Sequence, residues 1–468
     1  MIVTKFGGTS TQDASAIKNV VQIVSARLAQ KPIVVISAIA QATNMLEKAG
    51  KLAVEGKAGE ARDTLLTLFD RHYAIVDEII KDRERNVELR KIIASSIHEL
   101  EQLVAGVSIL RELTPRTLDA FYCYGELLSS RMVAAALQEF GIDAVWFDTK
   151  DFMVTDDNFN RALPLMEIVE ERLKSIALPL LEQSKTPVTQ GFIGITLSGV
   201  RTTMGRESSD YSASIIGSAL NVEDVQIWTD VDGVLTADPC VVSSPKKIKS
   251  LTFEEAFDLS YFGAKVLHPN TMLPALEKKI PIHIYNSRRP HLTGTRITST
   301  SHSDEATVKS VAYKQNMVLL TITPKKRYSQ SIFWEHIYTI LTRHDVVANM
   351  TTTSEYSLAI AIDGKDNIPA IVHELGEIGL VQILEGKGIV CVVGTNLRET
   401  PQLMERIFRS LAEFNVSAIS FGASKSNVAI VLENGVVLDA VRKLHREFFE
   451  AEHDEGKFEV LEHFHAQA

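Results

Sequence analysis

The sequence IVTKFGGTS, residues 2–10, joins a short apolar run to a pair of glycines. The run is rich in β-branched residues, which is typical of a buried strand. Glycines after a strand let the backbone approach a phosphate closely, and a following helix presents free N–H groups and the positive end of its dipole. Lys5 adds a full positive charge. The stretch therefore indicates an anion-binding connection between a strand and a helix, although an ordinary turn would look similar.

Strand-like and helix-like segments alternate through residues 1–290. Short apolar runs predict further strands at Ile33–Ala38, Ala144–Phe147, Pro187–Phe192 and Val225–Thr229. Helical patterns lie between the strands, at Asp13–Ala29, Gly59–Arg83 and Glu126–Phe140. Such alternation is typical of crossover units, so we expect an α/β fold with a mainly parallel sheet and helices on both faces.

The second part of the chain carries an internal repeat. Residues 285–305 are rich in Ser, Thr, Arg, Pro and Gly and predict a domain boundary. Beyond them, residues 340–363 resemble residues 410–433, and each copy suggests strands around a helix. This pattern predicts two small α+β modules with antiparallel sheets, and chance similarity is the alternative. The matching pairs are Leu341/Leu411, Val346/Val416, Ala348/Ala418, Ser354/Ser424, Ala359/Ala429 and Ile360/Ile430. We expect domains at residues 1–290, 306–390 and 391–468.

Composition limits the class of protein. The 468 residues carry a net charge of −10, with 45% apolar and 23% charged residues, which is typical of a soluble globular chain. Basic blocks with interleaved aromatic residues are absent from the sequence, so nucleic-acid binding is not indicated. Three scattered cysteines, Cys123, Cys240 and Cys391, predict neither a disulfide framework nor a zinc site. The sequence shows no signal peptide and no apolar run long enough to span a membrane, so we expect a cytoplasmic protein.

Three further motifs concentrate polar residues at predicted strand ends. GRESSDYS, residues 205–212, opens a helix after a loop, and its Arg206 has the fork geometry that suits a carboxylate. Ser209 or Asp210 could instead simply cap that helix. WTDVDGV, residues 228–234, places an acidic turn at the carboxyl edge of the sheet, where open α/β sheets bind ligands. FGAKVLHP, residues 262–269, brings Lys265 toward the same edge, unless it is an ordinary solvated lysine.

The motifs, taken in their order along the chain, resemble those of the aspartate kinases, which belong to the amino-acid kinase family. They are KFGGTS, GELLSS, QGFIG, GRxxSDYSA, WTDVDG and GAKVLHP. The resemblance covers nearly the whole chain and is greatest to the monofunctional, lysine-sensitive type, so we expect no appended homoserine dehydrogenase. TTSE at 352–355 and FGAS at 421–424 are similar to the tandem ACT modules of these enzymes. The resemblance implies a carbamate kinase-like sandwich followed by two ferredoxin-like ACT modules.

The activity that this resemblance implies is transfer of the γ-phosphoryl group of ATP to the side-chain carboxylate of L-aspartate. The nucleophile has a reference pKa of about 3.9, so it needs no general base. The site must instead neutralise charge between two anionic reactants. By resemblance, Lys5 stabilises the transferring phosphoryl group and Asp210 orients Lys5. The Walker pattern GxxxxGK[ST] is absent, so the nucleotide would be bound by another kind of loop.

The remaining site residues are also implied by the resemblance. Arg206 would bind the α-carboxylate of aspartate and Glu126 its α-ammonium group, unless Glu126 is a surface acid. Ser37, Thr43 and Ser209 would complete the substrate pocket, although Thr43 could merely cap a helix. Mg²⁺ is expected to accompany ATP, and no separate metal site is predicted. The residues expected to bind ATP are Lys5, Phe6, Gly7, Gly8, Thr229, Asp230, Lys265 and Val266.

Several positions depart from the family pattern. GRESSD replaces the usual GRGGSD, which puts Glu207 and Ser208 near the phosphates, while Leu235 and Cys240 replace a common tyrosine and arginine. The effector-binding position that is usually aspartate is Asn349, and a neutral amide binds an ammonium group less well. Lysine, threonine, another effector or none therefore stay open, and ACT pairing implies a homodimer or a dimer of dimers. The effector-site residues implied by the resemblance are Ser331, Phe333, Val347, Asn349, Ser354 and Glu355.

Two other functions compete with this hypothesis. One is a glutamate or acetylglutamate kinase of the same fold, against which the GELLSS segment and the ACT pair argue. The other is an amino-acid sensor that has lost catalysis, which the GRESSD substitutions motivate.

Overall fold

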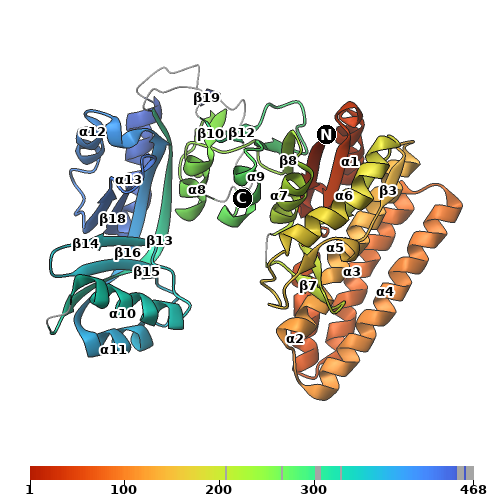
Figure 1. Ribbon diagram of the computed structural model, residues 1–468, viewed down its shortest axis with the longest axis horizontal. Helices are drawn as coiled ribbons and strands as arrows, with labels where there is room; N and C mark the ends of the chain where they lie inside the picture. Colours follow the sequence, from red (N-terminus) through yellow and green to blue (C-terminus); the bar gives the residue numbers. More distant parts are fainter. Residues whose placement is uncertain (206–207, 265–266, 301–306, 327–328, 451–457, 460–468) are drawn as a thin grey trace. The chain divides into compact units, whose positions relative to one another are not determined.

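The computed structural model describes residues 1–205, 208–264, 267–300, 307–326, 329–450 and 458–459. The chain divides into two compact units (Figure 1). The first contains Met1–Gly233 and Asn270–Ser299, and the second contains Val234–Pro269 and Thr300–Ala468. Arg206, Lys265 and Val266, which we expected at the site, lie outside the described residues. No helix among the described residues is both long and apolar enough to cross a membrane.

A mainly parallel sheet forms the centre of the first unit. Within this unit the strand order is β12-β11-β8-β1-β2-β5-β3, and only β12 pairs in the antiparallel sense. All five residues of β1 are buried, which agrees with the apolar, β-branched run in the sequence. The predicted α/β class is therefore confirmed. The strands are β1 (Ile2–Phe6), β2 (Pro32–Ile36), β3 (Ala144–Trp146), β5 (Thr186–Gln190), β8 (Asp224–Thr229), β11 (Ile282–Asn286) and β12 (Thr295–Thr298).

Helices cover both faces of this sheet. Phe6, Val34 and Ile36 pack with α1 and α5 in one apolar core, while α7 and α6 contact the sheet through other strand residues. The alternation of side chains along each strand makes both faces apolar. α3, α4 and α5 lie side by side (Figure 1). The helices are α1 (Ala14–Ser25), α2 (Ala42–Val54), α3 (Ala58–Ile79), α4 (Arg83–Leu110), α5 (Pro115–Glu139), α6 (Met166–Glu182), α7 (Ser209–Leu220) and α9 (Pro269–Glu277).

Two predicted helices differ in extent from the observed ones. The segment Gly59–Arg83 is divided, because α3 ends at Ile79 and the Asp82 carboxylate accepts a hydrogen bond from the Arg85 N–H at the start of α4. α5 begins well before the predicted Glu126, at Pro115. The Thr114 hydroxyl caps this start, and proline is favourable in a first helical turn. Glu126 therefore lies in the middle of a long buried helix.

A separate three-stranded sheet has the order β4-β6-β7, and β6 follows closely after β5 in the sequence. It consists of β4 (Val154–Thr155), β6 (Ile193–Thr196) and β7 (Arg201–Thr203). β7 leads directly into the GRESSD loop, so its position determines where that loop starts.

The second unit contains a six-stranded antiparallel sheet with the order β14-β15-β13-β16-β18-β17. The two copies of the repeat lie on opposite sides of the central pair β13·β16, which agrees with the predicted α+β modules. The elements are β9 (Lys247–Ile248), β10 (Ser250–Thr252), α8 (Phe253–Tyr261), β13 (Thr307–Pro324), α10 (Gln330–Arg343), β14 (Met350–Thr353), β15 (Leu358–Asp363), α11 (Ile368–Ile378), β16 (Gly379–Thr395), α12 (Leu403–Ser410), β17 (Ala418–Phe421), β18 (Asn427–Glu433), α13 (Val437–His445) and β19 (Phe458–Glu459).

Both modules share their two longest strands. The first half of β13 pairs with the second half of β16 next to β18, and the second half of β13 pairs with the first half of β16 next to β15. The pairing shifts register between Lys314 and Met317, near the middle of β13. Residue 390, where we expected a module boundary, lies inside β16.

Candidate active site

The glycine loop lies where β1 ends, between its two parallel neighbours. The Gly7 N–H donates to the Trp228 carbonyl at 3.1 Å, and the Ala40 N–H donates to the Gly8 carbonyl at 3.1 Å. A Cβ atom on Gly8 would lie 2.9 Å from the Ala38 carbonyl oxygen, so this backbone approach requires glycine. The loop is followed by a single 3-10 turn, Gly8–Ser10, and α1 begins only at Ala14. This start agrees with the predicted helical segment Asp13–Ala29, and Asp13 is the N-cap of α1.

Lys5 and Asp210 form the charged centre of the site. Lys5 is only 7% exposed, and its Nζ lies 2.5 Å from Oδ1 of Asp210. The contact is an ion pair without an aligned hydrogen bond. Asp210 lies in the first turn of α7, so the pair joins the end of β1 to the start of that helix. Ser208 occupies the N-cap position of α7 without a side-chain cap bond, so neither Ser209 nor Asp210 is the cap.

Glu126 projects from α5 toward the same region and is 3% exposed. Its Oε1 accepts a hydrogen bond from the Ala38 N–H at 3.1 Å, whereas its buried Oε2 has no partner among the described residues. Burial raises the pKa of Glu126 to about 8, and the Ala38 N–H and the positive charge of Lys5 oppose that rise. The surface-acid interpretation of Glu126 was therefore wrong, and Glu126 is close enough to Lys5 for their charges to interact.

The smaller polar residues lie on the loops around this centre. The Ser129 hydroxyl of α5 donates to the Ser37 carbonyl at 2.7 Å, which ties the loop after β2 to α5. Thr43 is half-buried inside the first turn of α2, whose N-cap is Gln41, so Thr43 is not the cap. Ser209 is buried against Gly191, where a Cβ atom would lie 2.7 Å from the Ser209 Cβ.

The turn after β8 is held by a buried carboxylate that the sequence did not single out. Asp232 accepts a hydrogen bond from the Asn286 amide at 2.7 Å and pairs with Arg289 at 2.5 Å. In the same turn, the Thr229 hydroxyl donates to the Asp230 carboxylate at 3.2 Å, and Asp230 is exposed. Phe6 is fully buried, and its side chain stacks with Trp228 in the core next to the glycine loop. The sequence indicated an acidic turn at residues 228–234, but not that Asp232 is its buried, paired carboxylate.

The residues expected to bind an effector lie in the second unit, two of them on α10 and four in the segments just before and just after β14. Asn349 is buried, and its Oδ1 accepts a hydrogen bond from the Lys314 ammonium at 2.5 Å. That ammonium also lies 4.8 Å from the centre of the Tyr261 ring, a cation–π contact. Phe333 is buried in the apolar core of the first module. Ser331, Val347, Ser354 and Glu355 are exposed.

Comparisons with known proteins agree with this architecture. The chain matches the amino acid kinase family over residues 1–286 and the ACT domain over residues 390–448. It is 33% identical to lysine-sensitive aspartokinase 3 of Escherichia coli, over 96% of this chain and 99% of that protein. It is also 33% identical to chloroplastic aspartokinase 1 of Arabidopsis thaliana, over 96% of this chain and 80% of that protein. A crystal structure of E. coli aspartokinase III with aspartate and ADP superposes with a TM-score of 0.84, at 32% identity over 96% and 100% of the two chains. The chain belongs to the amino acid kinase family, and within it to the aspartokinases.

Proposed function

We propose that this protein phosphorylates the side-chain carboxylate of L-aspartate with ATP, giving 4-phospho-L-aspartate and ADP. The observation that carries the proposal is the approach of three distant charged residues, Lys5, Asp210 and Glu126, beside a loop whose backbone approach at Gly8 requires glycine. A relative of similar length has been crystallised with aspartate and ADP.

In the proposed reaction, an oxygen of the aspartate side-chain carboxylate attacks the γ-phosphorus of ATP. The bond between that phosphorus and the β–γ bridging oxygen breaks, and the electron pair leaves with ADP. Lys5 supplies positive charge to the transferring group, and Asp210 keeps the ammonium in place. The backbone at Gly7 and Gly8 gives the phosphates close access.

Glu126 accounts for selection of an amino acid. Its unpartnered, buried Oε2 is an acceptor that the α-ammonium group of aspartate would satisfy. Arg206, which lies outside the described residues, would bind the α-carboxylate. The two charges would then complement the two ends of the zwitterion.

Mg²⁺ would enter with the nucleotide and neutralise phosphate charge. This ion usually keeps several waters and binds through substrate phosphates and one or two carboxylates. The exposed Asp230 carboxylate, at the end of β8, has suitable chemistry for one such contact. Within the part of the chain that the structure describes, no group of three or more His, Cys, Asp or Glu side chains gathers as a metal site.

The test is a hydroxamate assay with ATP, Mg²⁺, hydroxylamine and one amino acid. We expect the acyl hydroxamate with aspartate and none with glutamate or acetylglutamate. Product with glutamate instead would favour another kinase of this fold. Absence of product with every acceptor, despite nucleotide binding, would favour a sensor that has lost catalysis.

We further propose that free lysine inhibits this protein weakly through its ACT modules. The E. coli relative is described as lysine-sensitive. By resemblance, position 349 would hold the ammonium group of the effector. Here the Asn349 oxygen already accepts a hydrogen bond from Lys314 of the same chain. Free lysine would have to displace a tethered ammonium group from a neutral amide, which is unfavourable.

Replacing Lys314 by methionine should therefore increase inhibition by lysine about tenfold, because a charge-assisted hydrogen bond contributes about 1.5–3 kcal/mol. The concentration of lysine that halves the activity is measured for the wild type and for the variant. Lys365→Met, at an exposed lysine of the same module, should leave inhibition unchanged. Strong inhibition of the wild type, or no gain in Lys314→Met, would contradict the proposal. Threonine is tested in parallel, since its role is open.

A further inference from the structure

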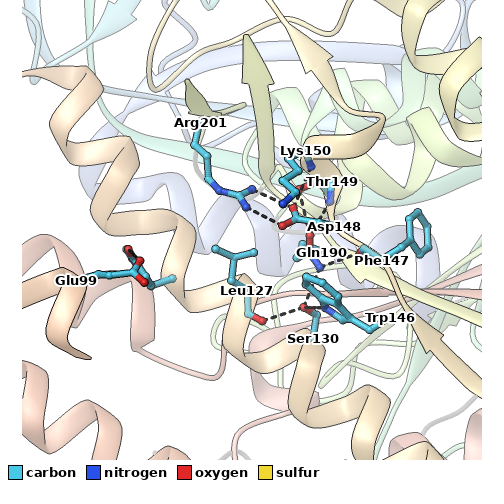
Figure 2. A network of polar contacts seen from close by, with 11 residues as sticks. Glu99, Leu127, Ser130, Trp146, Phe147, Asp148, Thr149, Lys150, Gln190 and Arg201 are labelled. Atoms are coloured by element: carbon cyan, nitrogen blue, oxygen red, sulfur yellow. Dashed lines mark hydrogen bonds and ion pairs between the residues drawn. The ribbon is translucent and has the colours of Figure 1, made fainter. Parts of the chain in front are cut away.

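β7 is held at both ends by buried carboxylates from neighbouring elements. At its C-terminal end, Asp119 of α5 accepts hydrogen bonds from the Thr203 N–H at 2.9 Å and the Thr203 hydroxyl at 2.5 Å. At its N-terminal end, Arg201 forms a two-pronged pair with Asp148, with N–O distances of 3.0 and 2.7 Å (Figure 2). The fully buried Asp119 and the 5% exposed Asp148 thus anchor one short strand.

Asp119 also fixes a third segment. Its Oδ2 accepts a hydrogen bond from the Asn160 N–H at 3.0 Å, and Asn160 has a positive φ of 65°. The Asn160 carbonyl lies 3.4 Å from where a Cβ atom of Gly205 would be, so this segment adjoins the start of the GRESSD loop. One carboxylate with three donors therefore joins α5, the loop before α6 and the end of β7.

The location of Asp119 relates it to substrate recognition. It precedes Glu126 by seven residues on α5, which places both on the same side of the helix. Thr203, its partner on β7, precedes Gly205 by two residues, and Arg206 follows at once. Asp119 thus joins α5, which carries Glu126, to Thr203 at the end of β7. Burial raises the pKa of Asp119, while its three donors favour the carboxylate form.

We propose that Asp119 is a positioning residue that sets the spacing between Glu126 on α5 and the end of β7, from which the chain continues to Arg206, and thereby the affinity for the amino-acid substrate. The inference rests on the proposed function, because it assigns these two residues to aspartate. Asp119 does not itself touch the substrate. It acts by holding the strand end from which the loop leaves, and a misplacement of about 1 Å can lower a rate a hundredfold.

Asp148 offers a matched control. It is another buried carboxylate that anchors the same strand, but at Arg201, on the side of β7 away from the GRESSD loop. The next residue, Thr149, donates its N–H to Gln190 of β5, and the Gln190 amide donates to the Ser130 hydroxyl of α5 (Figure 2). Asp119→Asn and Asp148→Asn should therefore both lower thermal stability, whereas only the first should disturb aspartate binding.

The experiment measures kcat and both KM values by ADP release, together with Tm. We expect Asp119→Asn to raise the KM for aspartate at least tenfold and to leave the KM for ATP within about twofold. Thr203→Val removes one of the three donors and should shift the KM for aspartate in the same direction. This variant provides the test if Asp119→Asn does not fold. Asp148→Asn should leave both KM values within about twofold.

The outcomes separate the two proposals. A folded wild type without aspartate-dependent activity would overturn the proposed function. If the wild type is active, but Asp119→Asn and Thr203→Val have the same KM for aspartate as Asp148→Asn, only the positioning role is overturned. Equal increases of the KM values for aspartate and ATP in Asp119→Asn would also overturn it.

Discussion

Replacing Lys5 by methionine should lower kcat about a thousandfold, with a much smaller change in the KM for ATP. Removing one donor that stabilises charge in a transition state typically costs a hundred- to a thousandfold in rate. Lys5 is buried and its ammonium is fixed by Asp210, so no flexible surface cation replaces it easily. Methionine keeps most of the side-chain length and removes the charge. The measurement is steady-state ADP release with saturating ATP and aspartate.

Two controls separate charge from packing. Lys18→Met, at a partly exposed lysine of α1 that pairs with Glu78, should keep wild-type kinetics. Asp210→Asn should reduce kcat less than Lys5→Met does, because the ammonium keeps its charge and loses only its fixed position. A Lys5→Met enzyme that retains a tenth of the wild-type kcat would show that this charge is not directed at the transferring phosphoryl group.

Much of the fold could be predicted because the strands of the first unit are buried on both faces. β2 is a continuous apolar run, and β1 and β8 are mostly apolar or β-branched and buried at nearly every position, a pattern that is typical of a parallel sheet. The helix limits were less predictable. The division between α3 and α4 depends on a single cap at Asp82, and the early start of α5 depends on Thr114 and Pro115. These capping residues stand inside segments whose apolar spacing continues the helical pattern, so the spacing alone does not show where one helix ends and the next begins.

The shared strands of the second unit were not predictable from the repeat. An internal repeat shows that two similar modules exist, but not which strands connect them. β13 and β16 each run past the centre of the sheet, with a register shift near Lys314 on one strand and a positive φ at Gly386 on the other. Pairing between segments so far apart in sequence depends on tertiary contacts.

The site was predictable to the extent that its residues stand in recognisable motifs. Lys5 and Asp210 come from two such motifs, and the structure places them in contact. Their roles stay predictions. Asp119 and Asp232 were not found, because an isolated aspartate in a helix or turn has the same sequence signature whether it is exposed or buried. Only the packing shows that Asp119 accepts three hydrogen bonds in the interior.

Aspartate should bind more tightly as the pH rises from 6 to about 8. Burial raises the pKa of Glu126 to about 8, so below this pH the free enzyme holds a proton on the group that must pair with the substrate's ammonium. Binding then requires loss of that proton. The apparent KM for aspartate should fall about tenfold per pH unit at the acid end and level off above pH 8, since one pKa unit corresponds to a tenfold change in population.

Glu126→Gln removes both the charge and the titration. Its KM for aspartate should lie about a hundredfold above that of the wild type at pH 8 and should change little between pH 6 and 8, because truncating a buried charge partner costs about 2–5 kcal/mol. Glu88→Gln, at an exposed glutamate of α4, should keep the wild-type profile. The KM for ATP serves as an internal reference, since Glu126 is not assigned to the nucleotide. A flat wild-type profile for aspartate across this range would mean that Glu126 is already ionised before the substrate arrives, and that the unpartnered oxygen is not the acceptor for its ammonium group.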